Sequence, residues 1–272
     1  MCGRGDWCGV SSDGTAAVCM RVESDRPVRN GGWLHRLTDA TSYVVEREAR
    51  RNPHDADPPR PDFDRLHRRY LADTSDARLE QFAVMLGLST ASLRRLGATW
   101  AAVHRAWAFP MRSPEGEVVG IRLRREDGYK WAVTGSRQGL FIPDGQPPDL
   151  ANHMLFCEGP TDAAALLDVG LYAVGRPSCS GGHDLVMPLA RGRDVVIIAD
   201  RDEPKTRPDG SIWYPGQEGA ERLAAGLFGK ARTVKIIRPT MGKDARQWIA
   251  AGATAVTIRA AVGNAKYWRP TT

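Results

Sequence analysis

Residues 195–205 read VVIIADRDEPK, an apolar run that ends abruptly in two aspartates, Asp200 and Asp202. An apolar run of this length, bounded by turn-forming residues, is typical of a strand buried on both faces of a sheet. Two carboxylates one residue apart at the end of such a strand are suitable oxygen ligands for a divalent metal ion. Several unrelated enzyme classes carry this pair, so its meaning depends on the rest of the chain.

The second half of the chain alternates short apolar runs with helical patterns, which predicts an α/β fold with a parallel sheet and crossover helices. Two further runs end near charged residues. MLFCE ends in Glu158, and TVKIIRP is followed by Lys243 and Asp244. In parallel sheets the ligand site lies beyond the carboxyl ends of the strands. We therefore expect these residues and the two aspartates to share one site, where a cation such as Mg²⁺ would offset their mutual repulsion.

The first half of the chain has a different pattern. Residues 51–61 contain four prolines and read as an exposed linker. From Asp62 to about Ala108 the apolar spacing is helical, with Gly87 ending one helix and Ser89 capping the next. Residues 107–142 carry two turn signals, SPEG and EDG, between short alternating runs, which predicts a β-meander.

Taken together, the segments EGPTDAAA, VVIIADRDEP and GKDARQWIAAG closely resemble the TOPRIM domain, which bacterial-type primases share with type IA and II topoisomerases and some nucleases. One departure stands out, because residues 203–215 intervene before the helix that normally follows the aspartate pair. The positions that fit the pattern are Glu158, Gly159, Asp162, Asp200, Asp202, Lys243, Asp244, Trp248 and Ile249.

The meander extends the resemblance specifically to bacterial and phage DNA primases, whose catalytic core carries a similar segment ahead of TOPRIM. Topoisomerases and TOPRIM nucleases lack this segment. The resemblance covers roughly residues 107–252. The positions that fit are Pro110, Arg112, Gly116, Gly120, Arg124, Lys130, Trp131, Ser136, Leu140 and Phe141.

The resemblance implies a nucleotidyltransferase that makes short RNA primers on single-stranded DNA from ribonucleoside triphosphates, beside a replicative helicase. It implies Mg²⁺ or Mn²⁺ at Asp200 and Asp202, with Glu158 completing the coordination or transferring a proton. Lys243 and Asp244 would organise the rim of the site. The cations that would hold template or triphosphate are Arg112, Arg122, Arg124 and Lys130. The implied domains are a zinc-ribbon-like module at 1–49, a linker at 50–61, a primase-core subdomain of helices and meander at 62–150, and a TOPRIM domain at 151–272.

The N-terminal module carries Cys2, Cys8 and Cys19 among glycine-rich turns. It resembles the start of the zinc ribbons that precede primase cores, but the first cysteine of the C-x-x-C-G knuckle is absent. Structural zinc takes four ligands, and His35 is the candidate for the fourth. A zinc site and a metal-free remnant both remain open. Cys157 and Cys179 are expected to be buried thiols.

Composition sets the remaining bounds. The 272 residues carry a formal net charge of +6, with basic residues crowded in the first half of the chain. Such a surface is typical of proteins that bind polyphosphates or nucleic acid. The start of the chain has no signal-peptide core and no apolar run is long enough to span a membrane, so we expect a cytoplasmic location without a membrane partner.

Two alternatives to a primase remain open from the sequence. One is a TOPRIM nuclease, since the same acids can support phosphodiester hydrolysis. The other is a non-catalytic, DNA-binding, primase-like accessory protein that works with a helicase. No G-x-x-x-x-G-K-[ST] segment is present, so this sequence contains no helicase motor.

Overall fold

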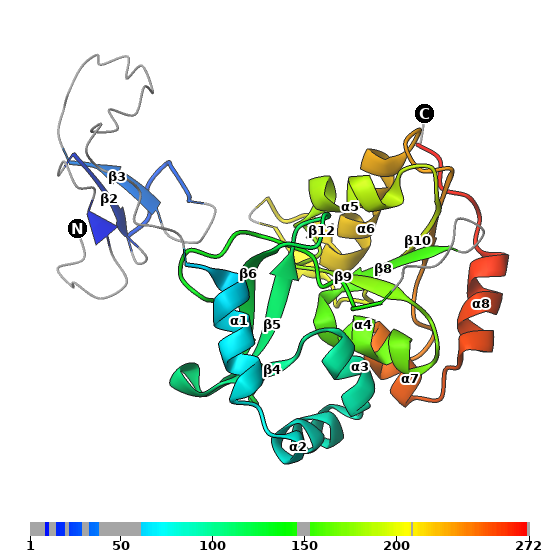
Figure 1. The fold of residues 1–272 in the computed structure, drawn as a ribbon. Coiled ribbons are helices and arrows are strands. Elements are labelled where there is room, and N and C mark those ends of the chain that lie inside the picture. Colours follow the sequence, from blue (N-terminus) through cyan, green and yellow to red (C-terminus); the bar gives the residue numbers. More distant parts are fainter. Residues whose placement is uncertain are drawn as a thin grey trace. The chain divides into compact units, whose positions relative to one another are not determined.

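The computed structural model describes residues 9–10, 15–19, 22–28, 33–37, 61–145, 153–207 and 209–270. The chain divides into two compact units, Met1–Asp57 and Pro58–Thr272. Figure 1 shows the elements of each unit.

The smaller unit contains a three-stranded antiparallel sheet in the order β1-β2-β3. Cys19 is buried at the end of β2, and its Sγ accepts a hydrogen bond from the backbone N–H of Val22. The side chain of His35, on β3, contacts the carbonyl of Val22 through Nε2 at 3.0 Å. Cys2 and Cys8 lie outside the described residues, so zinc binding stays a prediction. The strands are β1 (Gly9–Val10), β2 (Ala16–Cys19) and β3 (Trp33–Arg36).

The larger unit opens with three helices: α1 (Phe63–Ala72), α2 (Asp76–Leu86) and α3 (Thr90–Arg95). Their ends follow the local chemistry expected from the sequence. Gly87 closes α2 with φ +66°, a left-handed conformation that favours glycine. The hydroxyl of Ser89 accepts a hydrogen bond from the N–H of Ser92 and caps α3.

The prediction of helix up to Ala108 is wrong in its last part. After α3 the chain enters an antiparallel sheet in the order β4-β5-β6-β7. Trp100 and Trp107 are cross-strand partners in β4 and β5 with ring centroids 5.6 Å apart, and this aromatic pairing overrides the helical spacing of the alanines between them. The expected meander is confirmed. Its elements are β4 (Thr99–Ala101), the 3₁₀ turn η1 (Ala102–His104), β5 (Ala106–Arg112), β6 (Val118–Arg124) and β7 (Lys130–Ala132).

The second half of this unit is built on a parallel sheet in the order β13-β10-β8-β9, which confirms the expected fold class. Helices α4, α7 and α8 cover one face and α5 and α6 the other (Figure 1). The strands are β8 (Met154–Glu158), β9 (Ala173–Arg176), β10 (Asp194–Ile198) and β13 (Thr233–Ile237). The helices are α4 (Gly159–Asp168), α5 (His183–Ala190), α6 (Pro215–Leu227), α7 (Ala245–Ala250) and α8 (Ala255–Asn264).

Alternating side chains divide the interior of the parallel sheet into two cores. Leu155 and Ile198 belong to the cluster on the α4 face, whereas Phe156 and Ile197 belong to the cluster on the α6 face. Trp248 of α7 is buried in the first cluster, as expected for a packing residue. Cys157 is buried as predicted, and Cys179 is only partly buried.

The antiparallel and parallel sheets are joined by a short bridging segment. Arg112, at the end of β5, exchanges backbone hydrogen bonds with Leu140, and Phe141 does the same with Gly175 on β9. The ladder therefore continues from β5 to β9 and fixes the position of the meander relative to the carboxyl ends of the parallel strands.

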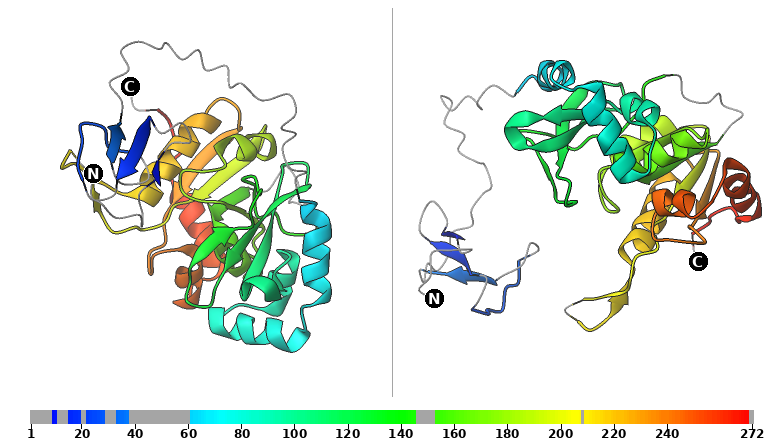
Figure 2. Two further views of the ribbon diagram at one scale, coloured as in Figure 1. Left: turned by 90° about the vertical axis from the view of Figure 1, so that its left-hand side faces the viewer. Right: turned by 90° about the horizontal axis from the view of Figure 1, so that it is seen from below.

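Residues 203–215, which depart from the family pattern, form a small hairpin of β11 (Lys205–Thr206) and β12 (Ile212–Trp213). The hairpin projects from the body of the larger unit (Figure 2, yellow). Arg207 fastens it to α6 by donating to Glu218 at 2.6 Å.

Among the helices of the described residues, none is long and apolar enough to cross a membrane.

Candidate active site

A cleft of about 210 Å³ lies where the carboxyl ends of the parallel strands meet the antiparallel sheet. Glu158 ends β8, Asp200 follows β10, and Lys243 and Asp244 follow β13, so the strand-end rule brings these four residues together as expected. The opposite wall comes from β6 and β7. The lining residues are Arg122, Arg124, Lys130, Phe141, Glu158, Gly159, Pro160, Thr161, Asp162, Pro177, Ser178, Asp200, Lys243, Asp244 and Arg246.

The acids of the cleft are buried close to one another, which raises their pKa values. Asp200 is only 9% exposed, and burial followed by the nearby charge of Glu158 raises its pKa to about 9. Burial also raises the pKa of Glu158, although the guanidinium of Arg176 opposes the shift. Burial and then the charge of Asp244 raise the pKa of Asp162 to about 8. Carboxylates this close stay ionised together only when positive charge is added between them.

Asp202, which the sequence placed in the same site, is not among the lining residues and reaches the cleft through Lys243. Its Oδ1 forms an ion pair with Lys243 Nζ at 2.9 Å, and its Oδ2 accepts a hydrogen bond of 2.7 Å from the N–H of Gly216 in the first turn of α6. The hydrogen bond to Asp202 is the main cause of the raised pKa of Lys243. The pair of aspartates therefore has one buried member, Asp200, and one paired member, Asp202.

The segment after β13 is tied to α4 by hydrogen bonds. Asp244 caps α7 by accepting from the N–H of Gln247 at 2.7 Å. The N–H of Arg246 donates to Asp162 Oδ1 at 3.0 Å, and its guanidinium donates to the carbonyl of Leu86. These bonds place Asp244 and Arg246 at the cleft independently of any bound ligand.

The basic wall consists of three side chains on adjacent strands. Arg124 and Lys130 are cross-strand partners, and Arg122 lies two residues before Arg124 on the same face of β6. Desolvation lowers the pKa of both arginines, and desolvation together with the charge of Arg124 lowers the pKa of Lys130. Nε of each arginine is buried without a hydrogen-bond partner in the part of the chain that the structure describes. Unsatisfied cationic donors that face a cleft suit a phosphate-bearing ligand.

Arg112, which the sequence grouped with these cations, does not line the cleft. Its guanidinium donates to the carbonyl of Gly116 at 3.1 Å and lies 3.5 Å from Asp144 Oδ1. The structure thus places Arg112 where it holds the turn after β5 instead of facing the acids.

Three residues that the sequence did not single out as site residues also belong here: Asp162, Arg176 and Arg246. Arg176 ends β9 in register with Glu158, is fully buried and donates to the carbonyl of Cys179. The rule that strand ends approach the site would have found Arg176, because it follows the apolar run YAVG. Asp162 was part of the quoted pattern but was not given a role.

The cleft suits a divalent metal by the chemistry of its donors. Oε1 of Glu158 is buried with no hydrogen-bond partner among the described residues, and Asp200 is crowded by like charges. Carboxylate oxygens of this kind are the ligands that Mg²⁺ prefers. Within the described residues no three acidic, histidine or cysteine side chains already converge on one point. Coordination through Asp202 Oδ1 requires exchange of its ion pair with Lys243.

The larger unit has the fold of the catalytic core of bacterial primases. The E. coli primase catalytic core aligns with a TM-score of 0.57 and 17% identity, covering 75% of this chain and 79% of that chain. A DnaG primase catalytic domain solved with single-stranded DNA aligns with a TM-score of 0.58 and 17% identity, covering 75% and 77%. A fragment of the Aquifex aeolicus primase, comprising zinc-binding and RNA polymerase domains, aligns with a TM-score of 0.58 and 14% identity, covering 75% and 60%.

At these identities the likeness concerns the fold, and it confirms the primase-core fold expected from the sequence. No protein-family model matches the chain. No curated protein sequence matches it either.

Proposed function

We propose that the protein is a DNA primase, a nucleotidyltransferase that makes short RNA primers on single-stranded DNA. The observation that carries the proposal is the meeting, in one cleft, of the acids at the carboxyl ends of the parallel strands with the cations of the meander. Arg122, Arg124 and Lys130 would bind phosphates, and Glu158 and Asp200 would serve the reacting centre. The likeness to a primase domain solved with single-stranded DNA supports the choice of template.

We propose Asp200, Asp202 and Glu158 as the ligands of Mg²⁺ or Mn²⁺. A bound ion would neutralise charge that develops as a 3′-hydroxyl attacks the α-phosphate of the incoming nucleotide. Lys243 would balance whichever aspartate oxygens the ion leaves free, since it already pairs with Asp202 at 2.9 Å. Arg176 would hold Glu158 in place from beneath, because the two residues are register partners on neighbouring strands.

The basic wall would position the polyanions. Arg124 and Lys130 lie directly across from the acids, so a triphosphate between the two walls would have cations on one side and the reacting centre on the other. Because these cations are partly desolvated, their attraction to phosphate is less screened than on an open surface. This placement favours alignment of two nucleotides on a template strand.

The finer division of the chain is part of the proposal: a zinc-ribbon-like module at 1–49, a linker at 50–61, a primase-core subdomain at 62–150 and a TOPRIM domain at 151–272. A replicative helicase remains the proposed protein partner on the basis of the sequence resemblance. In the N-terminal module, Cys19 is the one proposed zinc ligand among the cysteines that lies within the described residues.

A TOPRIM nuclease would use the same acids but has no need of the antiparallel sheet that forms half of this cleft. One assay separates the two functions. The protein is incubated with single-stranded DNA, Mg²⁺ or Mn²⁺ and labelled ribonucleotides, and both RNA products and template length are measured. We expect short RNA chains and an intact template. A shortened template without RNA products would establish the nuclease instead.

A further inference from the structure

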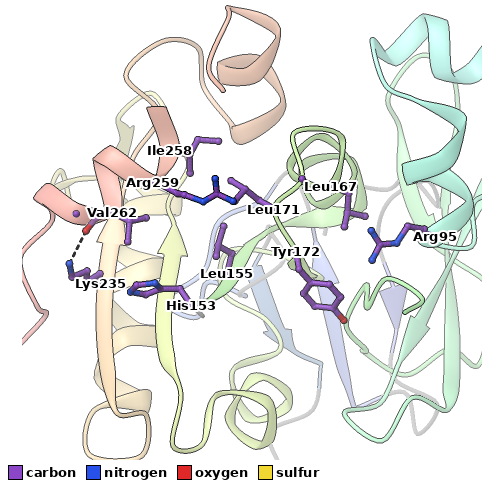
Figure 3. A pocket seen from close by; sticks show the side chains of 12 residues that line it. Arg95, His153, Leu155, Leu167, Leu171, Tyr172, Lys235, Ile258, Arg259 and Val262 are labelled. Carbon is purple, nitrogen blue, oxygen red and sulfur yellow. Dashed lines mark hydrogen bonds between the residues drawn. The ribbon is translucent and has the colours of Figure 1, made fainter. Parts of the chain in front are cut away.

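A second cavity lies between α4, α8 and strands β8 and β13, lined by residues distinct from those of the candidate active site. Its volume is about 670 Å³, within the range of pockets that hold small organic ligands. Figure 3 shows its side chains. The lining residues are Arg95, His153, Leu155, Leu167, Gly170, Leu171, Tyr172, Lys235, Ile258, Arg259, Val262 and Gly263. We refer to it as the α4–α8 cavity.

The charged lining of the α4–α8 cavity has one sign. It contains two arginines, a lysine and a histidine, and no aspartate or glutamate is among the lining residues. The charge of Asp194 interacts with that of His153, but Asp194 is already held by Arg232 and Thr233. Arg259 projects from α8 and is exposed. A concave surface lined by cations raises the local concentration of anions.

Lys235 is the buried cation of the α4–α8 cavity. The residue is only 8% exposed, and its ammonium donates to the carbonyl of Val262 at 2.7 Å and lies 4.8 Å from the ring centre of Tyr267. No carboxylate forms an ion pair with it in the part of the chain that the structure describes. A buried ammonium that has only neutral partners is costly, and an anion in the adjoining cavity would offset that cost.

The remaining wall is apolar. Leu155 and Leu171 lie at the centre of the view, with His153, Lys235 and Arg259 to one side and the ring of Tyr172 to the other (Figure 3). Leu167, Ile258 and Val262 complete the apolar lining. A ligand that fits both parts needs a negatively charged group and an apolar body.

We infer that the α4–α8 cavity binds a nucleotide, with its phosphates at His153, Lys235 and Arg259 and its base against Leu155 and Leu171. The apolar wall provides the surface on which a base packs. The cations supply charge-assisted hydrogen bonds to phosphate oxygens. This binding needs neither template nor metal, so it stands apart from the proposed primer synthesis.

Isothermal titration calorimetry with ATP, in chelator and without template, tests the inference. The background protein carries Arg124→Ala and Lys130→Ala, which weaken binding in the candidate active site. In this background we expect saturable binding of ATP, and much weaker binding of both adenosine and inorganic triphosphate, because each probe satisfies only half of the cavity.

Added to this background, Arg259→Ala should weaken ATP binding by roughly tenfold, the loss expected for one charge-assisted contact. Arg68→Ala on α1 is the matched control, since it removes another exposed arginine on a helix. Hydrogen exchange should show protection by ATP at Leu171 and Tyr172. The inference is overturned if the background protein does not bind ATP, if Arg259→Ala binds as well as Arg68→Ala, or if protection falls elsewhere.

Discussion

The pKa of Asp200 is raised further than that of Asp162, the other strongly perturbed acid of the candidate active site. The pKa of Asp200 rises from 3.8 to about 9 because it is buried beside other acids. Between these two values the folded protein keeps a proton that the unfolded chain releases, so the stability contributed at this residue falls as the pH rises from about 4 to about 9. Function and stability therefore oppose each other at Asp200.

Asp200→Asn should stabilise the protein in the presence of chelator at mildly alkaline pH. The amide does not titrate, so the variant escapes the cost of taking up a proton on folding, and we expect a gain of about 1–3 kcal/mol. Denaturant unfolding at a series of pH values measures this. The slope of stability against pH should be shallower in the variant. Equal slopes in the two proteins would contradict the assignment of this titration to Asp200.

Lys130→Ala should weaken nucleotide use without unfolding the protein. Lys130 lies on an exposed edge strand, and its ammonium faces the cleft. Removing one charge-assisted phosphate contact should raise KM for ribonucleotides by roughly tenfold or more. Lys230→Ala, in the turn after α6, is the control for loss of a surface lysine. A KM equal to that of the control would remove Lys130 from the binding wall.

A close backbone contact joins β9 to the start of α4, next to the cleft. Gly175 on β9 lies against the first residue of α4, and a Cβ added there would sit 2.3 Å from the carbonyl oxygen of Gly159. No L-residue fits this space without movement of the backbone. The same strand carries Arg176 beside Glu158, so this packing also positions the site.

Gly175→Ala should therefore destabilise the protein by about 2–4 kcal/mol through overpacking. Gly226→Ala is the opposite case, because Gly226 is exposed within α6 and an added Cβ would meet nothing within 4 Å. That change should stabilise by roughly 0.5–1 kcal/mol through helix propensity. Chemical unfolding of the two variants gives both values. A neutral Gly175→Ala would mean that β9 and α4 are less closely packed than described.

The elements also show what could be predicted from the sequence. The parallel strands and their charged ends were predictable, because long apolar runs and strand-end acids are local signals. The strand at Thr99–Ala101 was missed, because its pairing of Trp100 with Trp107 is a tertiary contact. The hairpin after Asp202 was seen as a departure from the family pattern, but short strands with few apolar residues carry no pattern that would have predicted its form.

For the larger unit as a whole, the decisive feature is the meeting of two sheets. Local patterns predicted each sheet, and the family resemblance predicted that both serve one site. Which cations of the meander reach the acids was not predictable from spacing. Arg112 lies at the point where the ladder passes to Leu140 and turns away, whereas Arg122 and Arg124 face the cleft. The strand-end rule brings Arg176 toward the site, but its place beside Glu158 depends on the order of the strands.

Metal binding should be visible as stabilisation of the whole unit. Mg²⁺ in ten- to hundredfold excess over its Kd should add about 1–3 kcal/mol. The gain should increase as the pH rises toward about 9, because the ion competes with the proton on Asp200. Thermal unfolding with Mg²⁺ or chelator at several pH values measures this, and Asp200→Asn should lose most of the effect. Equal stabilisation of that variant would place the ion elsewhere.

The proposed function requires that Asp200, in the cleft between the two sheets, support synthesis of RNA on a DNA template. The most direct measurement is the rate of formation of the first dinucleotide on single-stranded DNA by the unaltered protein, by Asp200→Ala and by Asp184→Ala, whose acid is exposed on α5. We expect product from the unaltered protein and from Asp184→Ala, and a loss of at least about a hundredfold in Asp200→Ala with template binding retained. Undiminished synthesis by Asp200→Ala would contradict the proposed role of Asp200.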